Sequence, residues 1–183
     1  MTPANRRPVH TRSIRIDAYV RDDNVWELVA SIRDVKYQDI ELDAGTLHAG
    51  DALHDMVITM ELDRRLEILA VQAKTMAAPF PGNCDTFSEV YQALVGLNLL
   101  QGFRAAVRER VGGNAGCTHI NELATLLPTA AIQAFSHDMD RPDIASGGMP
   151  AHLDRCRALR LDGPVVAKHY PRWHKIANEG DAK

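Results

Sequence analysis

Three short loops of this 183-residue chain carry side chains that bind metal ions or act as nucleophiles. His54 and Asp55 open a strand, Cys84 directly precedes one helix, and Cys117 and His119 open another. A thiol at the amino end of a helix has a lowered pKa, because unpaired backbone amides favour the thiolate that binds metal. One imidazole and two thiolates make an open zinc site, which a further ligand such as Asp55 or His119 would close. The loops therefore predict Zn²⁺ bound by His54, Cys84, Cys117 and, as a further ligand, His119.

Other chemistry fits the same residues. A thiolate at a helix start is also a nucleophile, so Cys117 with His54 or His119 would form a Cys–His pair, and the sequence leaves both readings open. A buried cysteine is often only a small apolar side chain, which is the reading we adopt for Cys156. Asp55, at the rim of the predicted site, is expected to act as a catalytic general base.

Strands must position the first of these loops. Four segments have apolar residues in alternation or in a short run, as strands do, and they are residues 14–20, 26–32, 54–62 and 66–75. Residues 36–53 between them read as irregular. His54 has the same parity as Met56 and Ile58, so its imidazole is expected on the face that the helices cover.

Helices must position the other two loops, because the apolar period changes to 3.6 in the second half. Thr86 and Glu89 have the spacing of a capping box, which predicts a helix start. A second helix is expected over residues 103–111, and a third from Thr118, with a kink or break at Pro128. Strands followed by helices predict an α+β fold, an antiparallel sheet of three to four strands with helices packed on one face.

The chain is expected to form a single α+β metal-binding domain over residues 1–137. Residues 138–183 read as a linker and a C-terminal segment packed on the same domain, because the segment contains Tyr170, Trp173 and several aliphatic side chains. Twenty-one basic against 24 acidic residues give no case for nucleic-acid binding. No segment is apolar enough to span a membrane. Three cysteines without a secretion signal predict a cytoplasmic protein with reduced thiols. A homo-oligomer is left open.

Motifs along nearly the whole chain resemble a bacterial family known as domain of unknown function 2889. The segments that carry the resemblance are Arg21–Trp26, Leu53–Met56, Pro79–Cys84, Leu94–Leu97, Val107–Gly113, Gly116–Leu123, Leu153–Cys156, Asp162–Val166 and Tyr170–Trp173. This resemblance implies no particular activity.

The order of ligands and elements is also similar to iron–sulfur cluster scaffold proteins of the NifU-like type, which implies their fold. In that comparison Asp55 matches the family's aspartate, Cys84 its middle cysteine, and Cys117 with His119 its last pair. The family's first cysteine is absent, with His54 nearby as a substitute, and the last pair is reversed and separated by Thr118. Cluster assembly needs sulfur-rich ligation, so this resemblance adds iron or an iron–sulfur cluster as the alternative cofactor.

Together these features predict a mononuclear metal-binding protein that is a metal-dependent lyase or hydrolase acting on a small molecule. The open metal position would polarise a substrate carbonyl or a water. Tyr170 and Trp173 would wall an apolar pocket, for which an aromatic compound is one option. The alternative function is a non-catalytic scaffold or carrier for iron–sulfur clusters or sulfur.

Overall fold

The structure is a computed structural model that describes residues 4–136, 138, 147–150 and 152–175. Its chain divides into two compact units, Met1–Ala131 and Ile132–Lys183. The first unit contains the sheet and all the predicted metal ligands, so the site is built within it.

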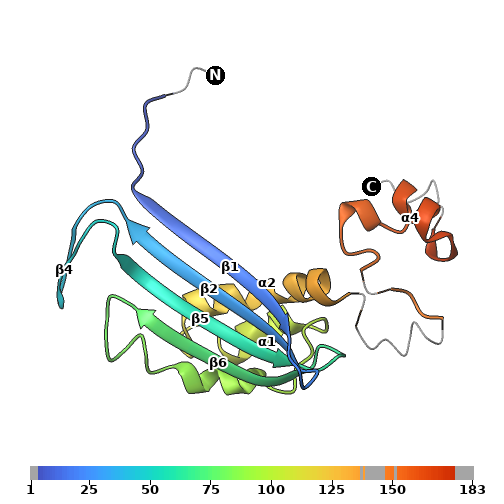
Figure 1. Cartoon of the computed structure of the whole chain (residues 1–183), viewed down its shortest axis with the longest axis horizontal. Coiled ribbons are helices and arrows are strands. Elements are labelled where there is room, and N and C mark those ends of the chain that lie inside the picture. The colour runs from blue at the N-terminus through green and yellow to red at the C-terminus, as the bar shows by residue number, and fades with distance from the viewer. Residues whose placement is uncertain (1–3, 137, 139–146, 151, 176–183) are drawn as a thin grey trace. The chain divides into compact units, whose positions relative to one another are not determined.

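A four-stranded antiparallel sheet dominates the first unit, in the order β1-β2-β5-β6 (Figure 1). Its strands are β1 (His10–Val20), β2 (Trp26–Lys36), β5 (Ala52–Leu62) and β6 (Ile68–Ala77). A separate two-stranded hairpin, β3 (Ile40–Leu42) with β4 (Gly45–Leu47), lies in the stretch that was predicted to be irregular. The four predicted strands are therefore confirmed, and the small hairpin was missed.

Helical segments follow the strands and cover one face of the sheet (Figure 1). They are the 3₁₀ helix η1 (Ser88–Leu94) and the α-helices α1 (Phe103–Arg110) and α2 (Thr118–Phe135). The covered face is formed by alternate residues of the two central strands, which are fully buried: Trp26, Leu28, Ala30, Ile32, Met56, Ile58, Met60 and Leu62. The mixed α+β class is thus confirmed, and the finer identity with a NifU-like fold stays a prediction.

Two local predictions about the helices were wrong. Thr86 does not cap a helix: its hydroxyl donates to the Asn83 carbonyl, and a 3₁₀ helix begins at Ser88. The break predicted at Pro128 does not occur, because α2 continues through it although proline removes a backbone donor; the alternative, a kink, stays a prediction. Leu127, before Pro128, and Ala131, after it, are both fully buried, so packing holds the helix on either side of the proline, and tertiary packing supplies most of a helix's stability.

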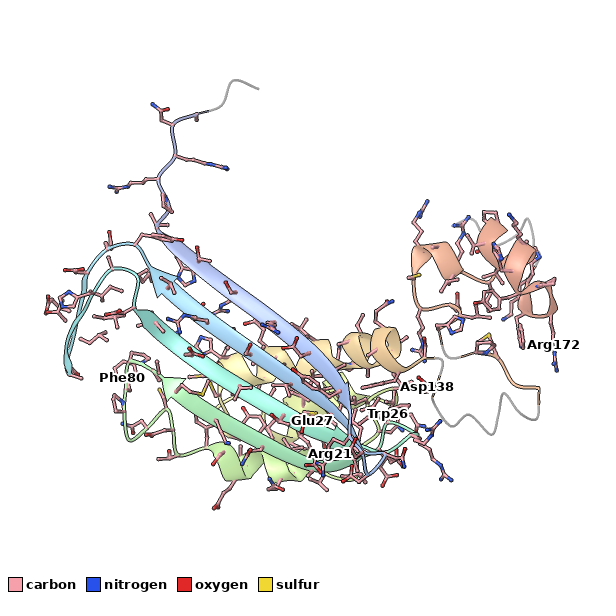
Figure 2. All side chains as sticks on the ribbon, viewed as in Figure 1. Arg21, Trp26, Glu27, Phe80, Asp138 and Arg172 are labelled. Carbon is pink, nitrogen blue, oxygen red and sulfur yellow. The ribbon has the colours of Figure 1, made fainter. Side chains whose placement is uncertain are left out.

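The second unit has a small apolar core of its own. Leu153, Leu161 and Val166 are buried, and Tyr170 and Trp173 pack against them. Its helical segments are η2 (Arg157–Leu159), α4 (Pro164–His169) and η3 (Pro171–Trp173), and Arg172, labelled in Figure 2, belongs to η3. The Arg172 guanidinium lies over the Trp173 ring, 5.3 Å from its centroid. The packing of residues 138–183 on the first domain stays a prediction.

Candidate metal centre

Asp34, near the end of β2, is the centre of a cluster of charged and imidazole side chains. Its side chain is only 1% exposed, on the sheet face that the helices cover. The strand register places Arg12 of β1 directly opposite Asp34, and Asp34 directly opposite His54 of β5. Side chains directly opposite each other on neighbouring strands lie on the same face, so three strands bring these three residues together.

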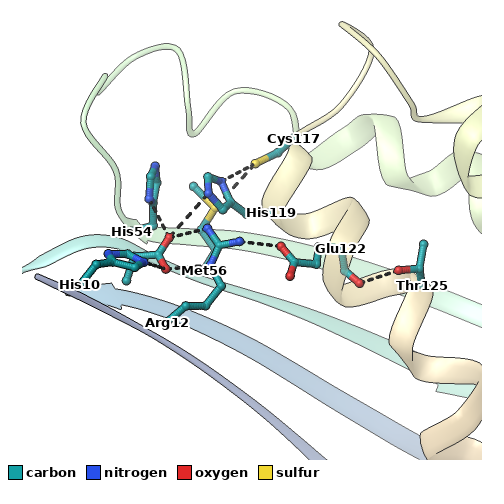
Figure 3. Close-up of polar contacts among 9 residues, drawn as sticks. His10, Arg12, His54, Met56, Cys117, His119, Glu122 and Thr125 are labelled. Carbon is teal, nitrogen blue, oxygen red and sulfur yellow. Dashed lines mark hydrogen bonds and ion pairs between the residues drawn. The ribbon is translucent and has the colours of Figure 1, made fainter. Parts of the chain in front are cut away.

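Arg12 binds both oxygens of the Asp34 carboxylate. Its Nε donates to Oδ1 and its Nη2 to Oδ2, both at 2.8 Å, and its Nη1 reaches Glu122 of α2 at 2.7 Å (Figure 3). His10 adds a contact of 3.3 Å from Nε2 to Asp34 Oδ1. This bidentate ion pair offsets the desolvation of the buried carboxylate, since a buried charge without a partner is strongly unfavourable.

Two imidazoles complete the cluster. His54 Nδ1 lies 3.0 Å from Asp34 Oδ2, and His119 Nε2, from the first turn of α2, lies 3.6 Å from the same oxygen. The two rings are 4.0 Å apart between centroids (Figure 3). Ligand atoms of Asp34, His54 and His119 all lie within 4.8 Å of one another, so these three residues could hold a metal ion.

The electrostatics of the cluster favour the forms that bind metal. The hydrogen bonds from Arg12 lower the pKa of Asp34 to about 2, against the opposing effect of burial. Burial lowers the pKa of His54 below its usual value, although the Asp34 carboxylate opposes this. Burial and the nearby His54 and Arg12 lower the pKa of His119. At neutral pH the carboxylate is therefore ionised and both imidazoles are neutral.

Cys117 lies beside the cluster. Its Sγ is 3.7 Å from His119 Nδ1 and 3.7 Å from Met56 Sδ (Figure 3). The buried Tyr91 holds the loop, because its hydroxyl accepts a hydrogen bond from the Cys117 amide and donates one to Asn121 Oδ1, each at 2.9 Å. The structure thus brings together three of the residues predicted from sequence, His54, Cys117 and His119.

Cys84 and Asp55 lie apart from that group. Cys84 is half-buried in the loop after β6, where its carbonyl accepts a hydrogen bond from Thr75, and its thiol is not among the clustered ligand atoms. Asp55 points to the opposite face of the sheet, where it forms an ion pair with Arg33 at 2.6 Å. The ligand role of Cys84 and the catalytic role of Asp55 stay predictions.

Two central residues were missed by the sequence reasoning. Asp34 follows Leu28, Ala30 and Ile32 in the alternation of buried residues along β2. An acidic residue at a position where the alternation predicts a buried side chain is a signal that could have singled it out. Arg12 gave no comparable signal, because its role depends on the pairing of β1 with β2.

The fold and the cluster define an α+β protein with a buried carboxylate, a clamping arginine and two imidazoles that could hold a metal ion. The chain belongs to the family described as "Protein of unknown function (DUF2889)", whose profile matches residues 10–133, from β1 into α2. The cluster lies entirely inside that match. No curated protein and no solved structure was found to match the chain. No helix of the described residues is long and apolar enough to cross a membrane.

Proposed function

We propose that this chain is a mononuclear zinc protein whose ion is held by Asp34, His54 and His119. The observation that carries the proposal is the convergence of one carboxylate and two neutral imidazoles within 4.8 Å, on three different elements of the fold. Imidazole nitrogen and carboxylate oxygen are ordinary zinc donors. Two imidazoles and one carboxylate also suit iron(II), which we keep as the alternative metal.

The spacing of the ligand atoms supports this reading. Neighbouring ligand atoms of a tetrahedral zinc ion lie about 3.3 Å apart, given bonds of about 2.0–2.1 Å. The distances from Asp34 Oδ2 to His54 Nδ1 and to His119 Nε2, 3.0 and 3.6 Å, lie on either side of that value. Small side-chain movements would therefore suffice to receive the ion.

Three protein ligands leave a fourth position for a small molecule. A zinc ion there supplies Lewis acidity toward a carbonyl or a water, which fits a metal-dependent lyase or hydrolase. Arg12 holds Asp34 in place through Oδ1, and Cys117 lines the side of His119 that faces away from the carboxylate. An aromatic substrate and a cytoplasmic location rest on the sequence features alone and remain part of the proposal.

Zinc titration of the 183-residue protein tests the proposal. We expect about one zinc ion per chain, and a Kd raised at least about 100-fold in His54→Ala and in His119→Ala, since even outer-shell changes cost 10- to 100-fold. His48→Ala is the matched control, because the His48 side chain is 73% exposed and its ring lies 3.5 Å from Asp39, outside the cluster. Equal affinity in all four proteins, with folding checked by circular dichroism, would refute the metal site.

The Arg12 clamp favours a second candidate, a metal-free thiol nucleophile. Arg12 already binds both Asp34 oxygens, which leaves Asp34 to orient an imidazole. His119 Nδ1 lies 3.7 Å from Cys117 Sγ, and His119 Nε2 lies 3.6 Å from Asp34 Oδ2. In this arrangement Cys117 would be the nucleophile, His119 the base, and Asp34 the carboxylate that orients the base. In metal-free protein this candidate predicts that iodoacetamide modifies Cys117 faster than the exposed Cys156, and that His119→Ala slows the reaction. Slower modification of Cys117 than of Cys156 would exclude it.

An iron–sulfur scaffold has less support from the donor set. Clusters are usually held by several thiolates. Of the three cysteines, Cys117 lies beside the imidazoles, Cys84 lies in another loop, and Cys156 belongs to the second unit. Anaerobic reconstitution with iron and sulfide would still test it, since a bound cluster absorbs visible light.

A further inference from the structure

The edge strand β1 presents an apolar strip of Ile14, Ile16, Ala18 and Val20, in which Ile16 is half-buried and the other three side chains are exposed. Val20 is 62% exposed and Ile14 39% exposed, whereas their partners on β2, Trp26 and Ile32, are almost completely buried. All four side chains lie on the same face of the sheet, because directly paired residues share a face. The helices therefore cover β2 completely, whereas on β1 they leave Ile14 and Val20 exposed.

Among the described residues, no other strand pairs with the outer side of β1. β1 is the terminal strand of its sheet, and the pairing of β1 with β2 is continuous, with no bulge and no proline. At the turn, the Arg21 amide donates to the Val25 carbonyl. Because bonding alternates along an antiparallel pair, odd-numbered residues of β1 bond to β2 and even-numbered residues direct their N–H and C=O groups outward. A long, regular edge of this kind is a template for another strand.

We propose that β1 pairs antiparallel with β1 of a second copy of the chain, with Ile16 at the two-fold axis. This register places Arg15 opposite the partner's Asp17 and Asp17 opposite the partner's Arg15, which gives two cross-strand ion pairs. Centring the pair on Arg15 would set two arginines face to face, and centring it on Asp17 would set two aspartates face to face. Like charges directly opposite each other are destabilising, so the charge pattern of β1 selects the Ile16 register among these three.

The same register covers the apolar strip. Ile14 lies opposite the partner's Ala18, Ile16 lies opposite the partner's Ile16, and these residues have the outward backbone groups that the new pair requires. Val20 lies opposite the partner's Arg12, the residue that clamps Asp34. Each copy would thus contribute an apolar side chain beside the cluster of the other copy. In the isolated chain Arg15 and Asp17 bond each other at 2.7 Å, so both are already placed on the outer face for the exchange.

Charge reversal tests the register directly. Sedimentation of the 183-residue protein at micromolar concentrations should show a dimer, and Arg15→Asp and Asp17→Arg should each raise the dimer Kd at least about tenfold. An equimolar mixture of these two variants should dimerise again, because the mixed pair restores both ion pairs. Arg160→Asp is the matched control, since it removes a similar pair with Asp162 outside β1.

A proline variant tests the outward edge without relying on charge. Ile16→Pro removes an N–H that points away from β2, so β1–β2 bonding is kept while pairing with a second copy is blocked. We expect a folded monomer. The proposal is overturned if the wild type is monomeric, as it would be if residues 138–183 cover β1, or if mixing the charge variants fails to restore the dimer. A dimeric Ile16→Pro protein overturns it equally.

Discussion

Replacing Asp34 by Asn tests whether this carboxylate stabilises the site and the strand that clamps it. Asparagine keeps the size of the side chain but removes the charge that Arg12 binds. The pKa of Asp34 is lowered from 3.8 to about 2 in the folded protein, chiefly by the hydrogen bonds from Arg12. One pKa unit corresponds to about 1.4 kcal/mol, so the ionised carboxylate contributes about 2.5 kcal/mol to the free energy of unfolding at neutral pH.

The sign of the pH dependence follows from the lowered pKa. As acid is added, the unfolded chain takes up the Asp34 proton before the folded chain does. The stabilisation is therefore complete above about pH 4 and is lost as the pH falls from about 4 to about 2. At pH 7 the free energy of unfolding of Asp34→Asn should be about 2.5 kcal/mol lower than that of the wild type, and this difference should shrink steadily below pH 4.

Urea unfolding followed by circular dichroism measures the stability difference at pH 7 and its change with pH. A chelator is included so that bound metal does not contribute. Asp55→Asn is the control, because Asp55 has an ion pair with Arg33 on the other face of the sheet, and such pairs contribute at most about 1 kcal/mol. An Asp34→Asn protein as stable as wild type at pH 7 would contradict the reasoning. A deficit that stays constant down to pH 2 would show that the loss is steric and not electrostatic.

Three other changes give separate tests. Tyr91→Phe leaves the Cys117 amide without its partner and should lower the free energy of unfolding by about 1–3 kcal/mol, measured in urea; an unchanged value would show that water replaces the hydroxyl. Gly116→Ala would place a Cβ 2.6 Å from the Val111 carbonyl oxygen, so its melting temperature should fall; a stable variant would show that the loop can move. Zinc affinity should stay constant from pH 8 to about 6.5 and weaken at lower pH. Burial lowers the pKa of His54 and His119, so protons compete with the metal for these imidazoles only in acid. Calorimetry that shows weaker binding at pH 7 than at pH 8 would contradict this.

Most of the fold could be predicted because its signals are local. Alternating apolar residues on the central strands reported the buried face correctly, and the change to a helical period separated sheet from helices. What failed depended on context: the helix α2 passes through Pro128 because packing on both sides outweighs the local cost. The Thr86–Glu89 pattern formed no cap because the chain there folds into a 3₁₀ turn.

The site was less predictable because its residues meet only through the register in which β1, β2 and β5 pair. His54 and His119 were recognisable as candidate ligands from their positions near the start of a strand and of a helix. Asp34 and Arg12 become neighbours of His54 only through two pairings, one of which shifts at a bulge beside Asp34. A shift of one residue would move Asp34 to the other face of the sheet, so its role could not be read from its own segment.

This dependence on register links the cluster to the edge of the sheet. Arg12 supplies the charge that allows Asp34 to be buried. It belongs to β1, the edge strand, whose residues are all exposed or half-buried. The same guanidinium also binds Glu122, so it ties the edge strand to α2, the helix that carries His119. Anything that orders β1, including a second copy of the chain, would therefore fix the carboxylate and both imidazoles in place. Conversely, fraying of β1 would leave Asp34 buried without its main partner, which would raise its pKa and weaken its hold on the two imidazoles.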